Sequence, residues 1–161
     1  MTVLITGASR GIGAGLAAQY AAAGQEVIGT GRSAGAQLTL DVTQPKSHSE
    51  MAEALGDCAI DLLVCNAGVY LDKGHGLDDG FGADLWAQTF AANVMGVFLT
   101  IQHLLPHLRR ADSAKIAIIG SQMGSDTRAG GSSYIYRASK AAVLNLGRNL
   151  ALDLKPEGIA V

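Results

Sequence analysis

Tyr136 and Lys140 stand four residues apart near the C-terminal end of the sequence. On an α-helix this spacing places both side chains on one face, one turn apart. A lysine ammonium beside a phenol favours the phenolate, which is the direction needed for acid/base catalysis near neutral pH. Tyr and Lys four residues apart also occur on ordinary solvated helix faces. The catalytic interpretation of this pair therefore depends on the rest of the sequence.

The elements around this pair are predicted as a strand followed by a helix. Residues 115 to 120 form a short apolar strand that delivers Ser121 at its carboxyl end. Residues 134 to 154 are predicted as a helix because apolar side chains recur at helical spacing. These positions are Val143, Leu146, Leu150 and Leu154. The fold would therefore bring Ser121 toward Tyr136 and Lys140.

The N-terminal residues have the pattern of a nucleotide-binding unit. A β-branched strand at residues 2 to 6 runs into Gly7-Ala8-Ser9-Arg10-Gly11-Ile12-Gly13, then a helix, then a strand at residues 27 to 30. Such a β-loop-α-β unit places a pyrophosphate at the helix N-terminus. The spacing Gly-x-x-x-Gly-x-Gly departs from the Gly-x-Gly-x-x-Gly fingerprint. We expect a dinucleotide to bind here.

The residues after the second strand indicate which dinucleotide binds. No Asp or Glu follows this strand; Arg32 stands there instead. An acid would hold a ribose 2'-hydroxyl, whereas an arginine pairs with a 2'-phosphate. Arg10 in the glycine-rich turn could reach the same phosphate. The sequence therefore favours NADP(H) over NAD(H), although both arginines could simply be solvated.

The third strand is predicted to end at Asp41 and Val42. The connection from Ser33 is too short for a full crossover helix. Asp41 lies on the carboxyl side of this strand, where parallel sheets bind ligands, or it forms a turn. A capping box, Ser47-x-x-Glu50, is expected to start the following helix.

Two further segments complete the predicted crevice. Asn66-Ala67-Gly68 follows a buried strand at residues 60 to 65, and such small residues let a flat ligand approach the backbone. A long apolar helix is predicted at residues 84 to 110, with Asn93 beside its apolar stripe. A mid-helix asparagine is either solvated or held inward for a reason. His103 and His107 are interpreted as a solvated helix end rather than a metal site.

The composition excludes several classes of protein. A formal charge of -2 with scattered Lys and Arg gives no basic surface for nucleic acid or membrane. We expect neither partner, no spanning helix, no leader segment and no metal. Two cysteines, Cys58 and Cys65, are interpreted as reduced and buried, as in a cytoplasmic protein.

The motifs in this order resemble the short-chain dehydrogenase/reductase family. They are Thr6-Gly7-Ala8-Ser9-Arg10-Gly11-Ile12-Gly13, Asp41-Val42, Asn66-Ala67-Gly68, Asn93, Ser121 and Tyr136-x-x-x-Lys140. The sequence around Ser121 and Tyr136 is most similar to that of the carbonyl-reductase subgroup that includes Sniffer and C-factor-like proteins. The resemblance implies an α/β fold, a Rossmann-type doubly wound parallel sheet with helices on both faces.

The resemblance also implies roles for individual residues. Tyr136 would be the acid/base, Ser121 would hydrogen-bond the substrate carbonyl, and Lys140 would bind the nicotinamide ribose. Asn93 would distort its helix to hold a proton-relaying water. The residues implied in cofactor binding are Gly7, Ser9, Arg10, Gly11, Ile12, Gly13, Arg32, Asp41, Val42, Asn66, Ala67, Gly68, Tyr136 and Lys140. Tyr136 is chosen over Tyr134 because only Tyr136 has a lysine four residues on.

These features predict a single NADP-binding domain over residues 1–161 whose C-terminal strands are missing, because the family pattern continues beyond Val161. The expected function is NADP(H)-dependent interconversion of a small-molecule carbonyl and an alcohol. A nucleotide-sensing or signalling protein of the same fold without meaningful catalysis is the alternative. The two long helices have apolar surface to spare, so a homodimer or homotetramer is expected.

Overall fold

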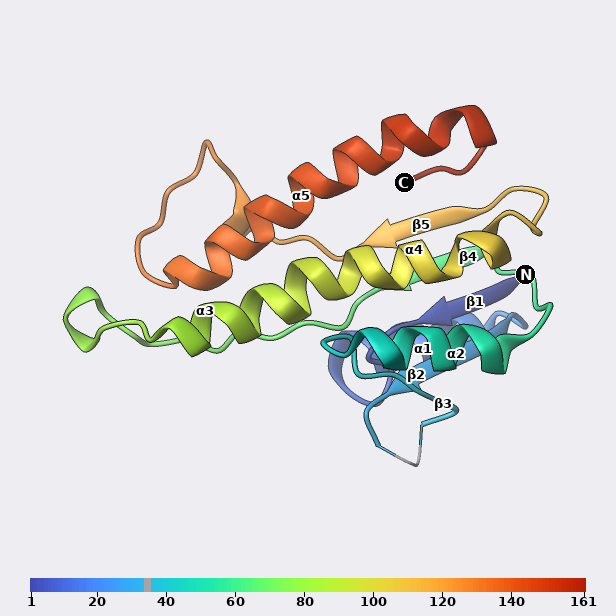
Figure 1. Cartoon of the computed structure of the whole chain (residues 1–161), viewed down its shortest axis with the longest axis horizontal. Helices are drawn as coiled ribbons and strands as arrows, with labels where there is room; N and C mark the ends of the chain where they lie inside the picture. Colours follow the sequence, from blue (N-terminus) through green and yellow to red (C-terminus); the bar gives the residue numbers. More distant parts are fainter. Residues whose placement is uncertain (34–35) are drawn as a thin grey trace.

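Five parallel strands form one sheet in the computed structural model, which describes residues 1–33 and 36–161 (Figure 1). The strand order is β3-β2-β1-β4-β5. Their bounds are Thr2–Ile5 for β1, Glu26–Gly31 for β2, Leu38–Thr39 for β3, Leu62–Cys65 for β4 and Lys115–Ile118 for β5. The order reverses between β1 and β4, and ligands of such sheets bind at the carboxyl ends of the strands beside this switch point.

Helices cover both faces of this sheet. Their bounds are Gly11–Ala22 for α1, Pro45–Leu55 for α2, Ala83–Phe90 for α3, Gly96–Leu108 for α4 and Tyr134–Leu154 for α5. On one face, Leu16 and Ala17 of α1 pack against Val3 and Ile5. On the other face, α2, α4 and α5 bury a larger core that includes Leu4, Met51, Leu63, Leu104 and Val143. The predicted doubly wound parallel sheet is confirmed.

The segment from Ala83 to Leu108 is one continuous helix with an irregular centre. Residues Ala91–Met95 form a π-helical turn between α3 and α4, which the sequence pattern alone does not place. By length and composition this segment could cross a membrane, contrary to the expectation of no spanning helix. Its C-terminal half buries Val97, Ile101 and Leu104 against the sheet, as in a core helix.

Two local predictions about helix starts and ends are wrong. The capping box at Ser47 does not form, because α2 begins at Pro45 and its N-cap, Gln44, makes no side-chain bond. The Ser47 hydroxyl instead accepts a hydrogen bond from the backbone N–H of Asp41 at 3.0 Å. His107 is buried rather than solvated, with Nδ1 lying 2.9 Å from the carbonyl oxygen of Cys58. The described residues contain no cluster of metal-ligating side chains.

The end of the sequence lies beside β5. Ala160 forms an isolated parallel bridge with Lys115, and the N–H of Ile116 donates to the Ala160 carbonyl at 2.7 Å. Ile159 is buried in the larger core. These contacts place residues 159 to 161 in the position of a further strand next to β5.

Candidate active site

A cleft of about 370 Å³ opens at the carboxyl ends of β1, β2 and β4. Most of the residues predicted to bind the cofactor line it. They are Gly7, Ser9, Arg10, Gly11, Ile12, Arg32, Asp41, Val42, Asn66, Ala67 and Gly68. The topological switch point therefore gathers segments from distant parts of the sequence, from Gly7 in the turn after β1 to Ala92 in the π-helical turn.

The glycine-rich turn has the geometry that a pyrophosphate needs. Gly7 and Gly11 adopt positive φ values of 68° and 58°, which side chains rarely tolerate. The helix N-cap, Arg10, makes no side-chain cap bond, so the first backbone N–H groups of α1 remain available to an anion. Gly13 is buried against this turn, and a Cβ there would lie 2.4 Å from the Gly7 carbonyl oxygen. The residues present fit a dinucleotide phosphate.

Asn66 holds the two halves of the cleft together. Its side-chain Nδ2 donates to the carbonyl oxygens of Thr6 and Gly7 at 2.9 and 3.1 Å. The Thr6 hydroxyl oxygen in turn accepts from the backbone N–H groups of Asn66 and Ala67, both at 3.0 Å. These bonds fix the glycine-rich turn relative to β4. The sequence spacing alone did not predict this structural role of Thr6.

Asp41 forms a local turn and also lines the cleft. Its carboxylate accepts hydrogen bonds from the backbone N–H and the hydroxyl of Thr43, at 3.0 and 2.7 Å. Burial raises the pKa of Asp41, but the Thr43 hydrogen bonds and the nearby charge of Arg32 outweigh it and leave the pKa below its usual value. Both interpretations of Asp41, turn former and cleft residue, therefore describe its placement.

Asn93 points inward from the π-helical turn and is only 1% exposed. Its Oδ1 accepts from the Val69 N–H at 2.8 Å, and its Nδ2 donates to the Val69 carbonyl at 2.9 Å. The same Nδ2 donates to the Ser139 hydroxyl at 3.0 Å. Asn93 thus connects the cleft wall after β4 to helix α5.

Tyr136 and Lys140 meet at the end of β5. The Lys140 ammonium lies 5.8 Å from the centre of the Tyr136 ring and donates to the Ile119 carbonyl at 2.7 Å. Lys140 is 8% exposed, and this burial lowers its pKa below the usual value. Two of its three ammonium hydrogens are left for other partners.

Ser121 lies two residues beyond the Lys140 contact, where it begins a short 3₁₀ turn at Gln122–Gly124. Its hydroxyl oxygen accepts from the Met123 N–H at 3.1 Å, which leaves the hydroxyl hydrogen free to donate. The turn packs directly on α5, since a Cβ on Gly124 would lie 2.6 Å from the carbonyl carbon of Lys140. Ser121 therefore lies at the start of a turn that packs on α5, the helix that carries Tyr136 and Lys140.

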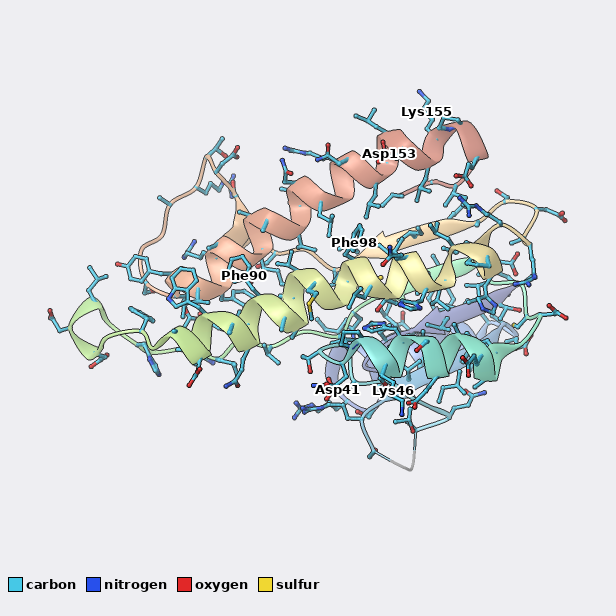
Figure 2. All side chains as sticks on the ribbon, viewed as in Figure 1. Asp41, Lys46, Phe90, Phe98, Asp153 and Lys155 are labelled. Atoms are coloured by element: carbon cyan, nitrogen blue, oxygen red, sulfur yellow. The ribbon has the colours of Figure 1, made fainter. Side chains whose placement is uncertain are left out.

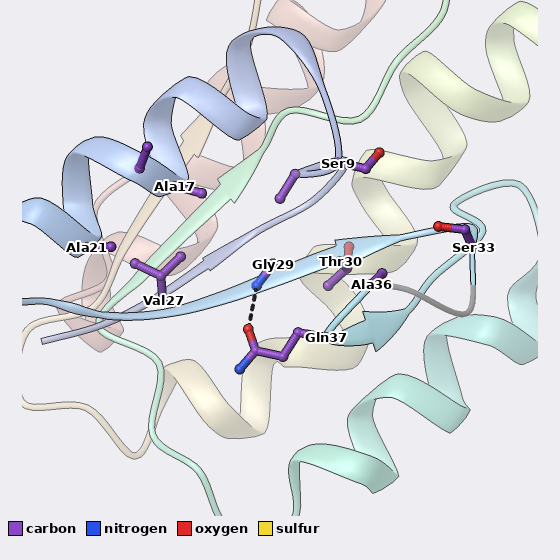
Figure 3. A pocket seen from close by; sticks show the side chains of 11 residues that line it. Ser9, Ala17, Ala21, Val27, Gly29, Thr30, Ser33, Ala36 and Gln37 are labelled. Atoms are coloured by element: carbon purple, nitrogen blue, oxygen red, sulfur yellow. Dashed lines mark hydrogen bonds between the residues drawn. The ribbon is translucent and has the colours of Figure 1, made fainter.

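A larger hollow of about 510 Å³ lies elsewhere, between α1 and the outer side of β2 (Figure 3). Small side chains such as Ala17 and Ala21 line it, and the side-chain oxygen of Gln37 accepts from the Gly29 N–H at 3.2 Å. The described residues between β2 and β3 form no crossover helix, as expected, so this flank of the sheet stays open. Its described lining includes no charged group. It is not the candidate site.

The model of the short chain dehydrogenase family matches residues 1–161. The chain belongs to this family. The FabG 3-oxoacyl-[acyl-carrier-protein] reductase of Escherichia coli is 33% identical over 175 residues, which cover 98% of this chain and 69% of that protein. Family membership makes the chain part of a group of NAD(P)-dependent oxidoreductases.

Three solved structures show the same fold. The NADP complex of Pseudomonas aeruginosa RhlG is 34% identical with a TM-score of 0.89, over 99% of this chain and 69% of that one. The Caenorhabditis elegans Sniffer protein, named as a carbonyl reductase, is 32% identical with a TM-score of 0.87, over 98% and 81%. A Streptomyces avermitilis short-chain dehydrogenase is matched over only 62% of its length.

Proposed function

We propose that the protein is an NADP(H)-dependent oxidoreductase that interconverts a carbonyl and an alcohol. The observation that carries this proposal is the buried Lys140 ammonium, which lies 5.8 Å from the centre of the Tyr136 ring, with the Ser121 turn packed on the same helix. Asn93 links this group to Gly68 and Val69 at the wall of the nucleotide cleft. A proton donor and a nucleotide site therefore share one edge of the sheet.

The chain's own residues have distinct roles in this proposal. Tyr136 donates a proton to the substrate oxygen during reduction and removes it during oxidation. Ser121 donates its free hydroxyl hydrogen to the same oxygen and stabilises the charge that develops there. Lys140 holds the nicotinamide ribose and favours the Tyr136 phenolate. The bound nicotinamide cofactor supplies or accepts the hydride.

Activity is tested with the complete protein and a panel of aldehydes and ketones. We expect NADPH consumption with at least one carbonyl compound, measured by loss of nicotinamide absorbance, and NADPH binding measured by fluorescence. Binding without turnover across the panel would contradict the proposal and would fit a nucleotide-sensing protein instead.

A preference for NADPH over NADH is proposed from Arg10 and Arg32, which both line the cleft. Arg32→Ala is expected to weaken NADPH binding about 10- to 100-fold, because a charged hydrogen bond to the 2'-phosphate is lost. NADH affinity should stay unchanged. Arg110→Ala is the matched control, because Arg110 pairs with Asp57 on the surface. Tighter binding of NADH than NADPH by the unmodified protein would contradict the preference.

A homodimer or homotetramer is proposed from an apolar surface on α3, α4 and α5. Phe90, Met95 and Phe98 border a shallow apolar hollow together with Leu146 of α5. Figure 2 labels Phe90 and Phe98 along the helix that runs beside α5. Light scattering should give at least twice the mass of one chain.

A cytoplasmic location is also proposed, supported by two free cysteines, of which Cys65 is buried with its pKa raised to about 12.

A further inference from the structure

The start of helix α5 lacks a cap of its own. Its N-cap residue, Ser133, is left-handed with φ 51° and makes no side-chain cap bond. The first N–H groups of a helix need partners when they are buried. Tyr136, the proposed acid/base, lies in this first turn, so its position depends on whatever satisfies these groups.

Asp72 supplies the missing cap from a distant part of the chain. Its side chain is 0% exposed, and Oδ2 accepts from the Ile135 N–H at 2.8 Å. The Tyr136 N–H faces both carboxylate oxygens, at 3.3 and 3.4 Å. A carboxylate at a helix N-terminus also interacts favourably with the helix dipole. This one buried side chain therefore holds the backbone of Tyr136.

Tyr70, from the same loop after β4, contacts the ring of Tyr136. The two rings stack with centroids 4.2 Å apart and planes 20° apart. The Tyr70 hydroxyl is hydrogen-bonded to the Ser133 hydroxyl, just before α5. One face of the Tyr136 ring is therefore covered, which restricts the rotation of the phenol.

The base of this loop is itself fixed to the proposed site. Asn93 binds both backbone groups of Val69, and the Ser139 hydroxyl joins Asn93 to the Tyr136 carbonyl, to which it donates at 2.8 Å. Residues 69 to 72 are thus held at one end by the π-helical turn and at the other by α5. This segment therefore connects the wall of the nucleotide cleft to the start of the helix that carries Tyr136.

We propose that Asp72 and Tyr70 are positioning residues for Tyr136, an inference that rests on the proposed function of Tyr136. Asp72 fixes the backbone of Tyr136, and Tyr70 fixes its ring. Neither side chain takes part in the chemistry. Together they hold the phenol in the orientation that proton transfer requires, and misplacement by about 1 Å can cost about 100-fold in rate.

The test compares Asp72→Asn and Tyr70→Leu with the unmodified protein, each as the complete protein with NADPH and the best carbonyl of the panel. Asp72→Asn keeps one acceptor oxygen but places an amide donor against the N–H groups of α5. Tyr70→Leu removes the stacked ring from a residue that is partly exposed, so folding should survive. We expect each to lower kcat about 10- to 100-fold with an unchanged NADPH Kd.

The matched control is Asp79→Asn in the same loop. Asp79 accepts a hydrogen bond from the Gly76 N–H at 2.6 Å and caps only its own turn. We expect its kcat to equal that of the unmodified protein. Wild-type kcat in both Asp72→Asn and Tyr70→Leu would overturn the positioning proposal, provided that Tyr136→Phe is inactive. Turnover by Tyr136→Phe would instead overturn the proposed function.

Discussion

Replacing Tyr136 with phenylalanine is expected to lower kcat about 100- to 10,000-fold, the usual contribution of general acid/base catalysis. The ring is retained, so the stack with Tyr70 and the start of α5 should stay intact. Only the proton-transferring hydroxyl is lost. NADPH affinity should therefore be unchanged when it is measured by fluorescence titration beside the steady-state rate.

The control for this prediction is Tyr134→Phe. Tyr134 is two residues away on the same helix, and its ring packs edge-on against Phe81. Removing its hydroxyl should leave kcat unchanged. A loss of turnover in Tyr134→Phe with retention in Tyr136→Phe would reverse the choice between the two tyrosines.

Gly13→Ala is expected to abolish NADPH binding at concentrations that saturate the unmodified protein. The new Cβ would lie 2.4 Å from the Gly7 carbonyl oxygen and 2.5 Å from the Asn66 side-chain nitrogen. The first atom belongs to the glycine-rich turn that fits a pyrophosphate, and the second donates to that turn from the segment after β4, so the turn must move. Overpacking of this kind also destabilises a protein by about 1–3 kcal/mol. Fluorescence titration and thermal unfolding measure the two effects.

A matched control lies two residues further along the same helix. Gly15 has no atom within 4 Å of its Cβ position. Gly15→Ala should therefore stabilise the protein by about 0.5–1 kcal/mol through better helix propensity, with NADPH binding retained. Normal NADPH binding by Gly13→Ala would show that the glycine-rich turn does not hold the phosphate.

Much of the fold and the cleft could be predicted because their signals are local. Apolar strands such as residues 2 to 6 end in turns with small residues, and parallel strands bring these turns to one edge. Gly7, Asn66 and Ser121 follow strands directly, so their placement followed from the strand assignment. Tyr136 and Lys140 are one helical turn apart, which the helix at Tyr134–Leu154 preserves.

The contacts that position these residues carry no such signal. Asp72 caps a helix that begins 62 residues later, and no spacing rule connects the two. Tyr70 lies in a loop without periodicity, so its stack on Tyr136 depends entirely on tertiary structure. The Ser47 capping box does not form for the same reason. The Ser47 hydroxyl accepts a hydrogen bond from the backbone N–H of Asp41 instead of capping its own helix.

The π-helical turn at Ala91–Met95 shifts the residues that follow it around the axis of the long helix. An α-helix turns about 100° per residue, and a π-turn inserts one extra residue. Downstream, Val97, Ile101 and Leu108 are buried, whereas upstream Trp86 of the same apolar stripe is exposed. The insertion thus puts the two halves of the helix out of phase. Trp86 before the turn and Phe98 after it are 39% and 41% exposed, so apolar surface is offered on both sides of the buried Asn93.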